Sequence, residues 1–205
     1  MINPAFPARF SLRNYVKTSA LSLLFFSLNS CALLAPLPES IENYPEDFAQ
    51  FLNSGNHYQS YDDLVYFLAS NGIDDTIPVW QLLQQGTDWK RHKLQKYAIP
   101  PRENWDDMVN TLIFLKYDLM PYIGPVKVLS GFRTPTYNRI AGGAAKSRHL
   151  DFSALDLRPI NEIKHSQLRD VLLERWTSIG KQYNLGLGLY SGSRFHIDTG
   201  GHRRW

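Results

Sequence analysis

The sequence contains a single cysteine, Cys31, among 205 residues. One thiol cannot form an internal disulfide or a cysteine-rich zinc site, so any metal site in this chain must use histidine and carboxylate ligands. The sequence also lacks a Gly-x-Ser-x-Gly segment, which excludes the nucleophile elbow of many serine hydrolases. A His-Glu-x-x-His segment is missing as well, and this excludes thermolysin-like zinc chemistry.

A strong charge of either sign is also missing, because the formal net charge is only +3. The basic residues form no continuous run and no nucleic-acid-binding module is apparent, so we expect no nucleic acid as a partner. An apolar fraction of 43% and a charged fraction of 20% are typical of a globular protein with a buried core. We therefore expect one ordinary domain with short additional segments, and a monomer.

Acidic residues are absent from the first part of the chain until Glu39. The same part carries three basic residues ahead of an apolar stretch over 20–28, namely Arg9, Arg13 and Lys17. This apolar stretch is too short to cross a bilayer as a mature helix, and it is typical of an export signal. The sequence thus predicts a protein exported to the periplasmic side.

The apolar stretch ends at Leu28-Asn29-Ser30-Cys31, which resembles the end of a bacterial lipoprotein signal. In such signals the cysteine becomes the lipidated first residue after cleavage. The alternative is an ordinary secretory signal in which Cys31 is incidental. We favour the lipoprotein because the only cysteine lies where the signal requires it, and we predict an outer-membrane lipoprotein held to the membrane through a lipid anchor on Cys31, since Ala32 supplies no acidic retention signal.

The remaining pattern predicts an α+β fold with a small, largely antiparallel sheet flanked by helices. We expect a signal segment over 1–31, a linker with a helical N-terminal lobe over 32–99, and the domain that carries the chemistry over 100–205. Apolar residues repeat at helical spacing between Asn104, the expected cap, and Pro121 with Gly124, the expected end of that helix. Short strands are expected at 126–129, 155–157, 186–190 and 194–198, the last two joined as a hairpin.

Two histidines and one aspartate form the candidate metal site. His149 is expected in a loop, whereas Asp156 and His196 lie on separate strands. Three such ligands suit zinc and leave a fourth position for water, as in catalytic sites. A lone histidine is more often an ordinary surface or core residue, but an aspartate between two leucines on a strand is costly to bury without a partner. Spacing alone leaves both interpretations open.

Three segments then resemble a known family. Ser147-Arg148-His149, followed by Ala154-Leu155-Asp156, is similar to the Ser-x-His-(six residues)-Asp signature of the zinc D-Ala-D-Ala carboxypeptidases and murein endopeptidases, which share the hedgehog/DD-peptidase fold. The segment from Ser130 to Pro135, with Asn138, resembles the Ser-Gly-Tyr-Arg-Ser-Pro segment of the same family. The ending from Phe195 to Gly200, with Arg203 and Trp205, resembles most closely the YcbK-type branch, murein endopeptidase K and its relatives. The resemblance covers roughly residues 100–205.

The resemblance implies Zn²⁺ as the cofactor, held by His149, Asp156 and His196. Two departures stand out: Phe152 replaces a usual glycine between the first two ligands, and Arg194 and Ser193 stand where relatives often carry the base.

Asp198 is the candidate general base, because residues two apart on a strand face the same side and Asp198 should project with His196. The alternative is that Asp198 orients a metal histidine. Asp151 is a weaker candidate for the base. Arg133 is the candidate substrate residue, since a guanidinium binds carboxylates in bidentate fashion. The alternative is that Arg133 is a surface ion-pair partner. Ser147 is expected near the substrate.

We therefore expect a zinc metallopeptidase, of the D-Ala-D-Ala carboxypeptidase or murein endopeptidase type, that cuts peptidoglycan stem peptides or cross-links. The alternative is a cell-envelope lipoprotein that binds zinc or murein without catalysis. Peptidoglycan is the expected partner in both cases.

Overall fold

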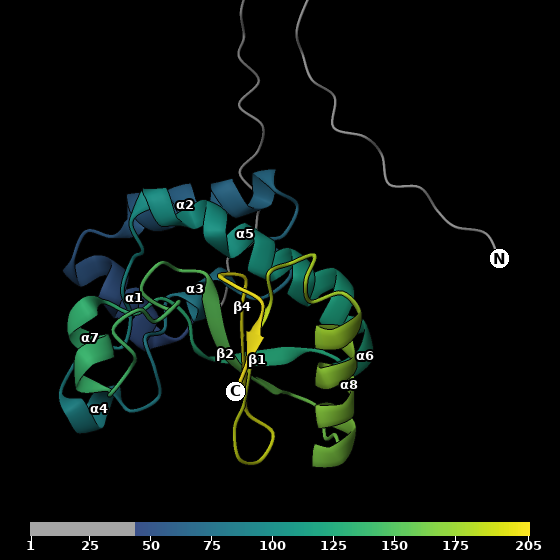
Figure 1. Cartoon of the computed structure of the whole chain (residues 1–205). Coiled ribbons are helices and arrows are strands. Elements are labelled where there is room, and N and C mark those ends of the chain that lie inside the picture. Colours follow the sequence, from purple (N-terminus) through teal and green to yellow (C-terminus); the bar gives the residue numbers. More distant parts are fainter. Residues whose placement is uncertain (1–43) are drawn as a thin grey trace, which may run out of the picture. The chain divides into compact units, whose positions relative to one another are not determined.

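The computed structural model describes residues 44–205 (Figure 1). The predicted signal segment and Cys31 lie outside the described residues, so the lipoprotein assignment stays a prediction. Within the described part of the chain, no helix is long and apolar enough to cross a membrane.

Four short helices make up the N-terminal part of the described chain. They are α1 (Glu46–Ser54), α2 (Tyr58–Ser70), α3 (Val79–Leu82) and α4 (Trp89–His92). Phe48 of α1 and Tyr61 of α2 are both buried, and their rings meet edge to face with centroids 5.1 Å apart. The predicted helical N-terminal extension is therefore present, and aromatic packing holds it together.

A long irregular helix follows and supports the sheet. It consists of η1 (Arg102–Asn104), α5 (Trp105–Ile113), the π-helical η2 (Phe114–Leu119) and α6 (Met120–Ile123). The prediction that Pro121 ends this helix is wrong, because Pro121 lies in the first turn of α6, where its missing N–H costs nothing. Gly124, with φ at 73°, ends it as predicted.

Asn104 precedes α5 at the predicted position, but its side chain makes no capping hydrogen bond to the helix. The prediction that this side chain caps the helix is therefore wrong. Its amide instead donates to the backbone oxygen of Leu150, at 3.3 Å. Thr111 of α5 likewise donates to the backbone oxygen of Ser153, at 2.8 Å. Both bonds fasten the helix to the loop that carries His149.

Five strands form one sheet with the order β1-β2-β4-β3-β5. They are β1 (Val126–Ser130), β2 (Ala154–Pro159), β3 (Gly186–Leu189), β4 (Phe195–Asp198) and β5 (Arg203–Arg204). Every pairing is antiparallel except that of β3 with β5. The predicted α+β class and the largely antiparallel sheet are confirmed, whereas the two-residue β5 was not expected.

The two faces of the central strands differ in polarity. Leu155 and Leu157 of β2 pair with Ile197 and Phe195 of β4, and these apolar side chains share the hydrophobic core with the N-terminal helices. Because side chains alternate along a strand, Asp156 faces the opposite side of the sheet.

The remaining helices, α7 (Pro135–Ile140) and α8 (His165–Ser178), lie on opposite sides of the sheet in Figure 1, with α8 beside α6. The proposed domain boundary between residues 99 and 100 stays a prediction. Residues on both sides of it contribute to one hydrophobic cluster.

Candidate metal centre

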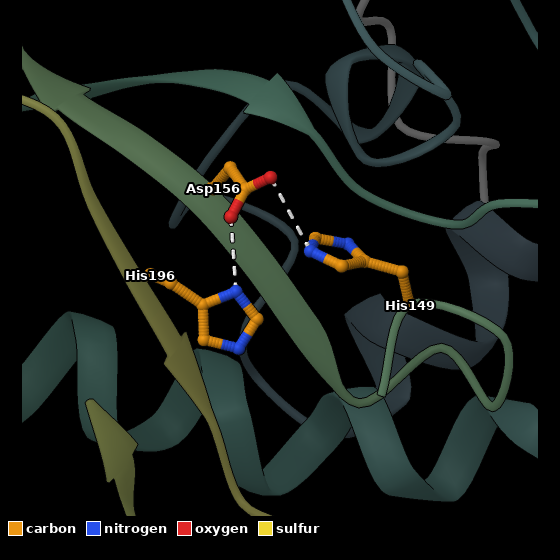
Figure 2. A group of neighbouring side chains, drawn as sticks. All are labelled: His149, Asp156 and His196. Atoms are coloured by element: carbon orange, nitrogen blue, oxygen red, sulfur yellow. Dashed lines mark hydrogen bonds and ion pairs between the residues drawn. The ribbon is translucent and has the colours of Figure 1, made fainter. Parts of the chain in front are cut away.

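The polar face of the sheet brings His149, Asp156 and His196 together (Figure 2). Asp156 and His196 are directly opposite each other in the antiparallel register of β2 and β4. His149 comes from the loop between α7 and β2, which folds back over the end of β1. Figure 2 shows the carboxylate of Asp156 lying between the two imidazole rings.

The spacing of the three side chains fits one metal ion. Asp156 Oδ1 lies 2.9 Å from His196 Nδ1, and Asp156 Oδ2 lies 3.4 Å from His149 Nε2. The three ligand atoms all lie within 4.8 Å of one another. Atoms at about 2.0–2.2 Å from a tetrahedral zinc ion lie roughly 3.3–3.6 Å apart, so only small shifts are needed.

Each histidine gives its other ring nitrogen to an oxygen acceptor. His149 Nδ1 lies 2.7 Å from the backbone oxygen of Gly131, and His196 Nε2 lies 3.0 Å from Asp198 Oδ2. These bonds leave Nε2 of His149 and Nδ1 of His196 facing Asp156. Metal-binding histidines are usually oriented in this way, which fixes the tautomer and the ring.

Asp198 is fully buried, and its contacts favour an orienting role over that of a base. It contacts His196 on Nε2, whereas Asp156 contacts Nδ1. Its carboxylate also accepts bonds from the backbone N–H of Gly200 and from both terminal nitrogens of Arg203. A Cβ on Gly186 would come within 2.2 Å of Asp198 Oδ2, so β3 needs glycine at this position.

The protonation states of His149 and Asp156 suit metal binding, whereas His196 favours its protonated form and must release that proton when a metal binds. Burial lowers the pKa of His149, which favours the neutral imidazole that a metal requires. Burial alone would raise the pKa of Asp156, but the adjacent His149 and His196 lower it further than burial raises it, and the carboxylate stays ionised. Burial opposes the charge on His196, yet its bonds to Asp156 and Asp198 raise the pKa of this ring overall.

Arg133 lies at the metal centre, with its Nη2 2.6 Å from Asp156 Oδ2. Its Nε donates to Ser130 Oγ at 2.7 Å and to the backbone oxygen of Gln85 at 3.1 Å. Three bonds therefore hold the guanidinium beside the ligand cluster. The predicted substrate residue is in place, although in this structure it is also the ion-pair partner of Asp156.

The N-terminal lobe supports the segment that carries Arg133. This support was not predicted from the sequence. The buried Gln85 accepts from the backbone N–H of Thr134 at 2.9 Å and from its hydroxyl at 2.8 Å. A Cβ on Gly131 would lie 2.0 Å from the backbone oxygen of Leu82, so only glycine permits this close approach. No sequence pattern marks Gln85, because its contacts join residues almost fifty positions apart.

The three candidate ligands open into a cavity of about 480 Å³. Arg133 and Ser147 line it, as expected, together with Trp205 and with Tyr190, which the sequence did not single out. Among the described residues, Asp156 is the only acidic side chain that lines it. The cavity is therefore basic around the ligand cluster, with an open approach to it.

Asp151, the weaker candidate for the base, does not line this cavity, and neither does His202. Asp151 forms an ion pair with Arg148 and accepts from Ser153 Oγ at 2.7 Å. His202 stacks on Trp176 with ring centroids 4.4 Å apart. Neither residue is positioned to act on a substrate at the metal centre.

Phe152 adopts a left-handed backbone conformation, with φ at 57°. This explains why glycine is usual here in the family that the sequence resembles. The Phe152 ring is fully buried and packs against Phe132 with centroids 6.1 Å apart. Burial of the ring thus offsets a backbone strain of about 1–2 kcal/mol.

We expect Phe152→Gly to lower the free energy of unfolding by roughly 2–4 kcal/mol. Loss of a buried aromatic ring costs about 3–5 kcal/mol, which exceeds the strain that glycine relieves. Phe152→Ala, which keeps most of the strain, should lie about 1 kcal/mol below Phe152→Gly. Denaturant unfolding of both variants measures these differences, and a glycine variant as stable as wild type would contradict this account.

Comparison with known proteins shows a match to a protein family. A family model described as peptidase M15 matches residues 80–198, which is more than half of the chain and includes all three candidate ligands. No curated protein and no solved structure matches the chain.

Proposed function

Because this chain belongs to the peptidase M15 family, whose members are zinc-dependent peptidases, we propose that it hydrolyses peptide bonds in peptidoglycan stem peptides or cross-links. The observation that carries the proposal is the convergence of His149, Asp156 and His196 at the floor of an open, basic cavity. Zinc at such a centre lowers the pKa of a bound water and polarises a carbonyl group.

Arg133 and Tyr190 are the chain's own groups for stabilising negative charge that develops on the substrate. Arg133 is held beside Asp156, and the Tyr190 hydroxyl lies 3.5 Å from Asp156 Oδ1. Partial burial and the nearby Asp156 raise the pKa of Tyr190 to about 12, so its phenol stays protonated at neutral pH. Tyr190 therefore donates a hydrogen bond and does not act as the base.

A peptidoglycan substrate is supported by the charge of the cavity. Stem peptides carry free carboxylates, and Arg133, Lys146, Arg148 and Arg203 all line the cavity against one acidic residue. The ending of the chain supports the YcbK-type branch within the family. An outer-membrane location through Cys31 belongs to the same proposal, and fatty-acid labelling of wild type against Cys31→Ser tests it.

The second candidate function is binding of zinc or murein without turnover. One observation favours it: apart from Asp156, no carboxylate from residues 44–205 lines the cavity, so this part of the chain offers no free carboxylate as a base. Assays with the purified protein distinguish the two candidate functions.

We expect the zinc-loaded protein to release defined fragments from purified muropeptides, and a chelator to stop the release. Mass spectrometry of the products identifies the bond and distinguishes a carboxypeptidase, which releases the terminal residue, from an endopeptidase, which opens cross-links. Binding of muropeptides without any product would support the non-catalytic function instead.

A further inference from the structure

A second cavity adjoins the metal cavity. It has a volume of about 410 Å³ and lies between the start of α8, the turn that joins β3 to β4, and β5. Tyr190 and Trp205 line both cavities, so the two share a wall. The Trp205 ring also lies close to the candidate ligand His196, with centroids 5.1 Å apart.

Several basic side chains line the second cavity, and no acidic residue of the described part of the chain is among its lining residues. Arg169, Arg194 and Arg204 line it from α8, from the β3–β4 turn and from β5, and His165 lies among them. Arg169 lies well before the other two arginines in the sequence, and all three line one cavity. The fold therefore concentrates positive charge beside the metal centre.

The arginines of the second cavity differ from those of the metal cavity in whether they form ion pairs with carboxylates. Arg133, Arg148 and Arg203 each form an ion pair with an aspartate. Among the described residues, Arg169 and Arg194 form no ion pair or side-chain hydrogen bond, and Arg204 only lies over the Trp176 ring, 5.4 Å from its centroid. The second cavity thus offers guanidinium groups that no carboxylate in residues 44–205 occupies.

We propose that the second cavity is a subsite for a carboxylate of the substrate, separate from the peptide bond at the metal centre. The proposal rests on the proposed peptidase function and specifies its substrate class as acidic peptides. Guanidinium groups bind carboxylates in bidentate fashion, and an anion between them relieves their mutual repulsion. A peptide with its scissile bond at the metal centre reaches this subsite by passing over Trp205 and Tyr190.

The test uses two matched stem peptides that differ only in whether the carboxylate away from the scissile bond is free or amidated. We expect zinc-loaded wild type to prefer the free carboxylate by about tenfold in kcat/KM, mostly through KM, since a charge-assisted bond at an exposed site is partly screened. The double variant Arg169→Gln/Arg194→Gln should lower this ratio to about one. The ratio in wild type should also fall as salt is added.

Lys181→Gln is the matched control, because it removes one exposed positive charge beyond the opposite end of α8 and lines neither cavity. Its ratio should equal that of wild type. The subsite would be overturned if wild type showed equal kcat/KM values for the two peptides. It would also be overturned if the double variant kept the wild-type ratio of these values.

Titration calorimetry with the same peptides separates this proposal from the proposed function. A tenfold difference in Kd without any turnover contradicts the peptidase function alone and supports the subsite. Turnover of both peptides with equal Kd values contradicts the subsite alone.

Discussion

Replacement of Asp156 by asparagine should remove zinc and peptidase activity together. The carboxylate lies between the two histidines and is the only anionic member of the ligand cluster. Asparagine keeps the shape but removes the charge that offsets the metal and pairs with Arg133. Losing an orienting partner alone costs about 10- to 100-fold in metal affinity, so loss of the ligand itself should exceed about 100-fold.

Zinc content and turnover of Asp156→Asn are measured on the same preparation. Asp151→Asn is the matched control, because it removes a carboxylate from the neighbouring loop that pairs with Arg148 and does not line the cavity. The control should retain zinc and turnover close to those of wild type. An Asp156→Asn protein that keeps stoichiometric zinc would refute the proposed centre.

Two of the three candidate ligands stand out locally in the sequence. Asp156 and His196 interrupt alternating apolar patterns on strands, and the same alternation predicted the two strands themselves. Their meeting depends on the register of β2 with β4, which places them opposite each other. Register and the return of the His149 loop are long-range properties, so the spacing alone left the site open and the resemblance was needed.

The supporting contacts could not be predicted for a related physical reason. The acceptor for His149 is the backbone oxygen of Gly131, and backbone oxygens carry no sequence signal. Gln85 acts through contacts with Thr134, which lies 49 positions away along the chain. The Asn104 prediction failed because a polar side chain near a helix start satisfied a carbonyl of another segment and left its own helix uncapped.

The Asp198→Asn variant distinguishes the two roles of Asp198, because loss of an orienting partner lowers zinc affinity whereas loss of a base lowers turnover. Its carboxylate bonds His196 on Nε2, while the ring nitrogen nearest the other ligands is Nδ1, and its remaining bonds go to Gly200 and Arg203. We therefore expect Asp198→Asn to lower zinc affinity by about 10- to 100-fold, with turnover recovered by excess zinc.

A base, by contrast, contributes about 10²- to 10⁴-fold in rate, and its loss leaves bound zinc unchanged. Arg203→Gln is the matched control, since it removes the guanidinium from Asp198 but leaves the bond between Asp198 and His196 in place. Its zinc affinity should stay nearer to that of wild type than the affinity of Asp198→Asn does. The contrary result is an Asp198→Asn protein that keeps full zinc occupancy but whose turnover excess zinc cannot restore. That result would return the role of base to Asp198, because a His196 ring that is only misoriented binds zinc less tightly and recovers when more zinc is added.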